Sequence, residues 1–139
     1  MIGYTMNQLE VGQRASFSKT VSESDVYLFA GISGDFNPAH VNQAYAENTA
    51  FKTRIAHGML SAGFISTVIG CQLPGPGTIY VSQTLNFLAP VAIGDTITAT
   101  AEVEEILTEK KRVRLKTVCT NQDGKEVLVG EALVSPPRG

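Results

Sequence analysis

A stretch of about 17 residues, from His57 to Leu73, carries no charged side chain between its ends and is apolar on every side of a helical wheel. A helix of this kind is typical of a position where other elements bury it. Gly58, Gly63 and Gly70 lower its helix propensity, which indicates that a backbone or a ligand packs closely against it. Pro74-Gly75-Pro76-Gly77 ends it. The sequence therefore predicts one buried central helix.

The residues after this helix follow a strand pattern. Apolar and polar residues alternate over 79–87, 97–103 and 112–116, and Asp123-Gly124 predicts a hairpin before a last strand from Glu126 to Val134. Strands joined by short turns form an antiparallel sheet. We therefore expect an α+β fold in which a curved antiparallel sheet wraps around the central helix.

The residues before the central helix predict three shorter elements. Arg14 to Thr20 alternates as a strand does. Ser22, followed by Asp25 three positions on, is a helix start, and the predicted helix runs from Glu23 to Ser33. A further short helix is expected from Asn42 to Asn48, with Tyr45 packing inward.

Length and composition restrict the class of protein. A chain of 139 residues is expected to form one domain, residues 1–139. A net charge of −2 gives no general attraction to nucleic acid or to anionic membranes, and every apolar stretch is too short to span a bilayer. Cys71 and Cys119 lack metal-ligand spacing and are typical of a reducing compartment, so we expect a cytoplasmic protein.

The segment Ile32-Ser33-Gly34-Asp35-Phe36-Asn37-Pro38-Ala39-His40 places a carboxylate and an imidazole five positions apart. Pro38 fixes its own φ and disfavours helical angles at Asn37. Gly34 allows backbone angles that are closed to other residues. We therefore expect a rigid, non-helical loop that points Asp35 and His40 into one space.

The second histidine, His57, opens the motif Ala56-His57-Gly58-Met59 at the start of the central helix. We expect this motif and the Asp35–His40 loop to form one active site. For His57 itself we favour capping or packing ahead of Gly58. Two histidines without clustered carboxylates are a poor ligand set, so no metal site is expected.

These residues carry a family resemblance. The segment 27–46, centred on Gly34 to His40, resembles the signature of the (R)-specific enoyl-CoA hydratases of the MaoC-like dehydratase family, and the Ala56–Met59 motif, the position of Ser66 and the segment 77–87 agree with it. The resemblance covers nearly the whole chain. It implies the hot-dog fold, a homodimer whose sheets join edge to edge, and an acyl-CoA thioester as substrate with no separate cofactor.

The resemblance also assigns roles to residues. Asp35 and His40 would be the catalytic pair, holding one water for addition to C3 of a trans-2-enoyl thioester and returning a proton to C2. The backbone N–H of Gly58 would bind the thioester oxygen, because helix N-termini have unpaired donors. Ser66 would be the active-site serine.

The neighbouring positions are candidate substrate-binding residues: Phe36, Asn37, His57 and Met59. Among them, Asn37 is favoured as a residue that holds the loop and Phe36 as a core residue.

Other functions stay open on the sequence alone. The same motif serves 3-hydroxyacyl-acyl carrier protein dehydratases. Hot-dog thioesterases need a carboxylate and a thioester pocket but not this pair, and a non-catalytic acyl-CoA-binding module needs neither Asp35 nor His40. The hand of the product, (R), and a syn addition follow from the resemblance and from the single catalytic pair. Acyl chain length, carrier and pathway are not set by the sequence.

Overall fold

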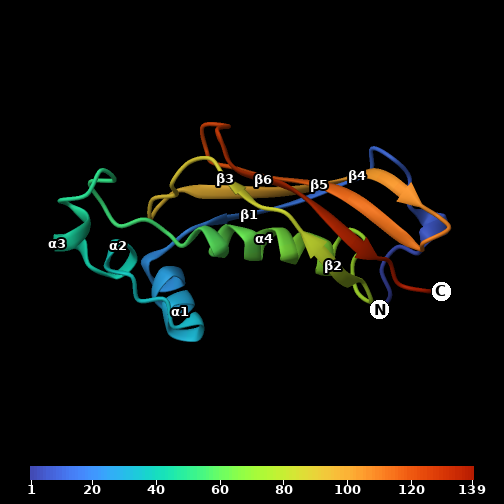
Figure 1. Ribbon diagram of the computed structural model, residues 1–139, viewed down its shortest axis with the longest axis horizontal. Helices are drawn as coiled ribbons and strands as arrows, with labels where there is room; N and C mark the ends of the chain where they lie inside the picture. Colours follow the sequence, from blue (N-terminus) through green and yellow to red (C-terminus); the bar gives the residue numbers. More distant parts are fainter.

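The computed structural model describes residues 1–139 and contains one antiparallel sheet with several helices (Figure 1). The strands are β1 (Arg14–Thr20), β2 (Ile79–Gln83), β3 (Asn86–Phe87), β4 (Thr96–Leu107), β5 (Arg112–Thr120) and β6 (Glu126–Ser135). Their order across the sheet is β1-β4-β5-β6-β2, and β3 pairs with β6 off this path.

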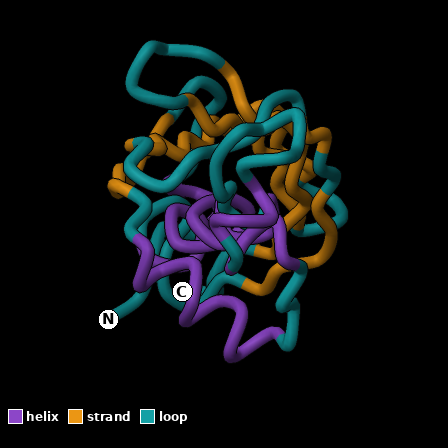
Figure 2. Tube along the Cα trace, turned by 90° about the vertical axis from the view of Figure 1, so that its left-hand side faces the viewer, coloured by secondary structure: helices purple, strands orange, loops and turns teal.

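The central helix is α4 (Gly58–Cys71), and the strands curve around it (Figures 1 and 2). It packs against β1, β4, β5 and β6, as the sequence predicts. Its buried side adds Phe64, Ile65 and Val68 to the core. Its other side is exposed within the single chain, so α4 is buried on one side rather than all round. No helix in the molecule, α4 included, has the length and apolar character needed to cross a membrane.

The alternating strands supply the other half of the core. In β4, Ile97, Ala99, Ala101 and Val103 are fully buried, and the polar residues between them lie on the opposite face. This is the pattern expected of a sheet with one face on a helix and one in water. The two alanines leave room for α4 to approach the sheet closely.

Three short helices gather at the end of the molecule away from both termini (Figure 1). They are α1 (Glu23–Ser33), α2 (Pro38–Val41) and α3 (Gln43–Ala46); a single 3-10 turn, η1 (Met6–Gln8), lies near the N-terminus. Helix α1 begins with the predicted capping box, in which Ser22 and Asp25 each accept the other's backbone N–H. It ends at Gly34, whose φ of 82° requires glycine.

The predicted loop contains helical structure that the sequence analysis missed. Residues Pro38–Val41 form the helical turn α2, so the expectation of a wholly non-helical segment up to His40 was wrong. Proline is well suited to the first turn of a helix, where its missing N–H costs nothing, and the Asn37 side chain caps this turn by accepting from the Ala39 N–H.

The segment 79–87 also differs from the prediction of one continuous strand. It is divided into β2 and β3, and β2 occupies an edge of the sheet. Its apolar side chains are not buried: Ile79 is 66% exposed and Val81 is 45% exposed. An edge strand with exposed apolar residues and unpaired backbone groups is a surface that can pair with another chain.

Candidate active site

A largely apolar cavity of about 500 Å³ lies at the N-terminal end of α4. Its walls come from the loop before α4, from the first turn of α4, from β3 with the loop that follows it, and from β6. Apolar side chains, among them Phe51, Ile55, Phe87, Val91 and Leu128, make up most of the surface. His40 and Gly58 also line it. The cavity can therefore hold an apolar chain beside a small set of polar groups.

Asp35 directly follows Gly34 and is exposed; it does not line the cavity itself but lies beside His40, which does. One of its carboxylate oxygens accepts a hydrogen bond from the Asn37 backbone N–H at 3.1 Å. This local turn keeps the carboxylate beside the start of α2 and leaves its remaining lone pairs free. One carboxylate oxygen of Asp35 and one ring nitrogen of His40 lie within 4.8 Å of each other.

His40 reaches the cavity from α2, and its ring is fixed by a backbone contact. Its Nδ1 lies 2.7 Å from the carbonyl oxygen of Ile55. A carbonyl oxygen only accepts, so Nδ1 carries the proton and donates. In the neutral ring Nε2 is then a free acceptor, which is the state that a general base requires.

Gly58 is the first residue of α4, and its backbone N–H finds no acceptor within the chain. This is the usual condition of the first N–H groups of a helix, and the helix dipole makes the position favourable for negative charge. The absence of a side chain matters here, because a Cβ on Gly58 would lie 2.6 Å from a ring carbon of Phe87. The missing side chain of Gly58 thus leaves room for the Phe87 ring, and its unpaired N–H lies in a residue that lines the cavity.

Asp35, His40 and His57 form a cluster whose candidate ligand atoms lie within 4.8 Å of one another. The arrangement fits a metal ion poorly. The rings of His40 and His57 are stacked, with centroids 3.9 Å apart and planes only 28° apart. Imidazole lone pairs lie in the ring plane. Nearly parallel rings therefore direct their lone pairs side by side rather than toward one ion, as tetrahedral ligation requires.

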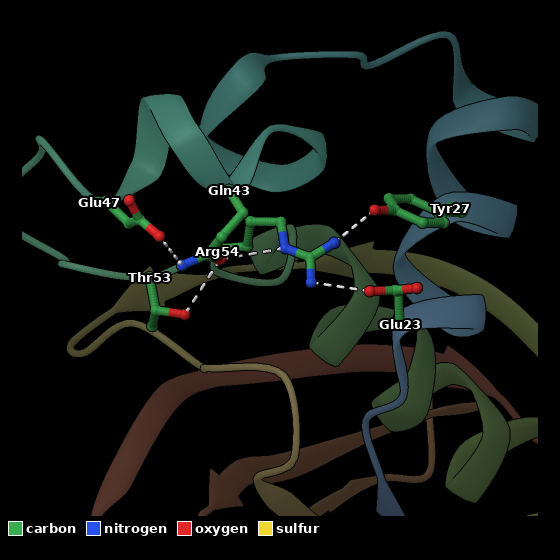
Figure 3. A network of polar contacts seen from close by, with 6 residues as sticks. All are labelled: Glu23, Tyr27, Gln43, Glu47, Thr53 and Arg54. Atoms are coloured by element: carbon green, nitrogen blue, oxygen red, sulfur yellow. Dashed lines mark hydrogen bonds and ion pairs between the residues drawn. The ribbon is translucent and has the colours of Figure 1, made fainter.

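A polar network joins α1, α3 and the segment before α4, which flank the residues from Asp35 to His40 (Figure 3). At its centre Arg54, just before Ile55, donates to Glu23 at 2.7 Å, to the hydroxyl of Tyr27 and to the side-chain oxygen of Gln43. The hydrogen bond to Glu23 raises the pKa of Arg54 above its ordinary value, although partial burial opposes the shift. Arg54 thereby ties α1 and α3 to the loop that leads into α4.

Comparison with known proteins agrees with this geometry. Residues 6–126 match the family model described as the MaoC like domain. The chain belongs to the MaoC-like domain family. It is 60% identical to an (R)-specific enoyl-CoA hydratase of Rhodospirillum rubrum, over 99% of this chain and 94% of the relative. It is 52% identical to a 3-hydroxybutyryl-CoA dehydratase of Methylorubrum extorquens, over 94% and 82% of the two chains.

Solved structures give the same result for the fold. An unliganded R-hydratase from Pseudomonas aeruginosa superposes with a TM-score of 0.94 at 50% identity, over 99% of this MaoC-like chain and 88% of the other. The expected α+β hot-dog fold is thereby confirmed.

Among the positions predicted from sequence, the structure brings Asp35, His40, His57, Gly58 and Met59 to one end of α4. Met59 lines the cavity, as a substrate-binding residue should. His57 is buried and does not line it; it occupies the N-cap position of α4, as the capping-or-packing interpretation allows, but its side chain makes no cap hydrogen bond and only packs.

Three other predicted site residues lie away from the cavity surface. Phe36 is 61% exposed, so it is neither a core residue nor a lining residue within this chain, and Tyr45 is likewise exposed. Asn37 caps α2 and does not line the cavity, which agrees with a loop-holding role and not with substrate binding. Ser66 lies on the exposed side of α4, two helical turns from Gly58, and does not line the cavity of its own chain.

Ser61 is a lining residue that the sequence analysis missed. It is buried, sits one helical turn after Gly58 and faces the same cavity. The signal was available, because positions three apart share a helix face and Ser61 is a polar residue in an apolar helix. Further lining residues, from Phe87 to Val91 and at Val127 and Leu128, come from distant segments that only the folded sheet brings together.

Proposed function

We propose that this protein is an (R)-specific enoyl-CoA hydratase, which adds water reversibly to a trans-2-enoyl-CoA and forms an (R)-3-hydroxyacyl-CoA. One observation carries the proposal. A carboxylate and a correctly protonated imidazole, Asp35 and His40, lie within 4.8 Å of each other beside an apolar cavity at a helix N-terminus. Membership of the MaoC-like family and the names of the close relatives support it.

Asp35 and His40 are the proposed catalytic residues. A water that bonds to both can bridge a separation of about 5 Å, since each hydrogen bond is about 2.8 Å long. Nε2 of His40 takes a proton from this water while the oxygen attacks C3 of the enoyl group. The C2–C3 π electrons move toward the thioester, and C2 then receives a proton from the same pair. No electrons enter or leave, so the reaction requires no redox cofactor.

The backbone N–H of Gly58 is the proposed donor to the thioester oxygen. Negative charge grows on that oxygen as water adds to C3. A donor that is already fixed and unpaired stabilises this charge without reorganising. Gly58 lines the cavity, so a thioester bound there can reach this end of α4. The acyl chain then lies along the apolar wall formed by residues such as Val91 and Leu128.

We further propose a homodimer that forms through the edge strand β2. The support is its unpaired edge and the exposed apolar side chains of Ile79 and Val81. Pairing of two β2 strands would extend the sheets across both chains. The exposed side of α4, which carries Ser66, is a second surface that one chain leaves uncovered. Both cysteines are free, in keeping with the expected cytoplasmic setting.

Incubation with crotonyl-CoA tests the function. Loss of the enoyl absorbance without release of free thiol is the expected result, and an (R)-selective but not an (S)-selective dehydrogenase should oxidise the product. Release of thiol would indicate a thioesterase, and no change would indicate a binding module. A strong preference for the crotonyl group on acyl carrier protein would indicate a 3-hydroxyacyl-acyl carrier protein dehydratase, which catalyses the same reaction on a different carrier.

The stereochemistry gives a sharper test of the single catalytic pair. When hydration runs in deuterated water, the deuterium at C2 should lie syn to the new hydroxyl, because both arrive from the face that Asp35 and His40 occupy. Anti addition would require a second acid on the opposite face and would contradict the proposed mechanism.

A further inference from the structure

His57 lies between the Asp35 loop, the ring of His40 and the first turn of α4, and only 3% of its surface is exposed. It does not line the cavity. Its side chain does not cap the helix that follows it. A buried polar ring in this place therefore has a role other than binding or capping.

The two nitrogens of His57 have opposite environments. Nε2 lies 2.9 Å from the backbone carbonyl oxygen of Asp35, so Nε2 carries the proton and donates. Nδ1 is buried and has no hydrogen-bond partner. Burying a polar atom without a hydrogen-bond partner costs free energy. The other contacts of the His57 ring must therefore offset the cost of burying Nδ1.

Those contacts join both proposed catalytic residues. The His57 ring stacks on the His40 ring, and their centroids are 3.9 Å apart. The ring of Phe29, in α1, also packs against His57, with a centroid distance of 4.8 Å. Packed between two rings, His57 has little freedom to rotate. Asp35 is in turn held at three points: its carbonyl accepts from His57, its carboxylate accepts from the Asn37 N–H, and its own N–H donates to the Ser33 hydroxyl.

We propose that His57 is a positioning residue, which fixes the distance between Asp35 and His40 through the Nε2–H bond to the Asp35 carbonyl and the stack on His40. This inference rests on the proposed hydration. Without the hydrogen bond the loop after Gly34 loses its tie to α4, and the carboxylate drifts relative to Nε2 of His40. Misplacement of a catalytic group by about 1 Å can lower a rate by about a hundredfold.

Two amide substitutions at His57 distinguish the effect of its hydrogen bond to Asp35 from the effects of side-chain size and polarity. In His57→Gln the side-chain amide nitrogen reaches about as far as Nε2, so it can donate to the Asp35 carbonyl. In His57→Asn the amide reaches only as far as Nδ1 and cannot. We expect His57→Asn to lower kcat for crotonyl-CoA hydration about tenfold to a hundredfold. KM should stay within about twofold because His57 does not line the cavity. His57→Gln should recover most of kcat.

Equal loss in both variants, or full kcat in His57→Asn, would overturn the proposal. So would a loss that appears in KM alone, which would indicate a binding role. Melting temperatures of both variants serve as the control. If His57 were merely structural, the loss of kcat would follow the loss of stability and would not depend on whether the side chain can donate to the Asp35 carbonyl.

The wild-type protein offers a test that does not depend on whether the variants fold. Only two histidines are present, so a protein labelled with ¹⁵N in its imidazole rings gives two ring systems by NMR. At a pH where both rings are neutral, His57 should be protonated at Nε2 and His40 at Nδ1. Protonation of His57 at Nδ1 would remove the basis of the inference. Absence of hydration by wild-type protein would instead contradict the proposed function, so the two failures are distinguishable.

Discussion

The Nδ1 atom of His40 lies 2.7 Å from the carbonyl oxygen of Ile55. This contact decides which ring nitrogen is available for chemistry, and it links the imidazole to the loop that leads into α4. His57 is held in the opposite sense, with Nε2 on the carbonyl oxygen of Asp35. Two backbone carbonyls thus select two different tautomers within one stacked pair of rings.

The first prediction concerns the catalytic pair. His40→Gln and Asp35→Asn should each lower hydration of crotonyl-CoA by orders of magnitude, because the water loses either its base or its second partner. The double variant should lose little more than either single variant, since the groups act as a unit. Steady-state kinetics of the three variants measure this. Near wild-type turnover in either single variant would exclude that residue from the catalytic pair.

The second prediction concerns Gly58. Gly58→Ala places a Cβ 2.6 Å from the Phe87 ring and crowds the approach to the backbone N–H. Turnover should fall about a hundredfold or more, which is the usual effect of losing one such donor. Adding Phe87→Leu should relieve the clash and restore stability more than turnover. Full turnover in Gly58→Ala would mean that the thioester oxygen binds elsewhere.

The third prediction concerns the network in Figure 3. Arg54→Met keeps an apolar stem but removes the donors to Glu23, Tyr27 and Gln43. The free energy of unfolding should fall by about 1 to 2 kcal/mol, and kcat should fall with it, because α1 and α3 lose their tie to the active-site loop. Arg14→Met is the control, since its pair with Glu102 is well exposed and should matter little. Equal losses of stability and of kcat in the two variants would contradict the proposal that Arg54 ties α1 and α3 to the active-site loop.

The fourth prediction concerns assembly. Ile79→Lys puts a charge on the exposed edge strand and should shift the protein from dimer to monomer in sedimentation experiments. Val11→Lys is a matched control, because Val11 is also 66% exposed but lies outside the strands. A fully active wild-type monomer at micromolar concentration would contradict the proposed dimer.

The fifth prediction concerns pH. Lys19 and the backbone N–H of Ser22 bond to Asp25 and hold its pKa below the ordinary value. A carboxyl whose pKa is lower in the folded state stabilises the fold above its unfolded pKa, and this contribution is lost as the pH falls through the folded pKa. Asp25→Asn should therefore be less stable than wild type at pH 7, with the gap closing in strong acid. Melting curves against pH test this, with Asp123→Asn on an exposed turn as the control.

Much of this architecture could be predicted from local patterns. The Ser22–Asp25 capping box and Gly34 define the two ends of α1, and the alternation along β4 identifies its buried face. The fold class followed because one uncharged apolar helix needs a sheet to cover it. Asp35, His40 and Gly58 could be named as candidates because their motif and its resemblance identify them without tertiary information.

What could not be predicted depends on three-dimensional context. Pro38 was interpreted as a helix breaker, although with Asn37 as cap it begins α2. Phe36 and Tyr45 were predicted to be core residues from their aromatic character, yet both are exposed on the single chain. Of the two polar side chains at Ser61 and Ser66 of α4, only the packing of the helix against the sheet shows that Ser61 is the one facing this cavity.

Two separate parts of the chain line the cavity, so each part can change independently of the other. His40 and Gly58 come from the segments before and at the start of α4, whereas Val91, Val127 and Leu128 come from the sheet and its loops. Substitutions in the sheet wall should therefore change the length of the space proposed for an acyl tail without moving His40 or Gly58. Evolution or an engineer can thus alter substrate range on one side of the cavity and leave the chemistry on the other side intact.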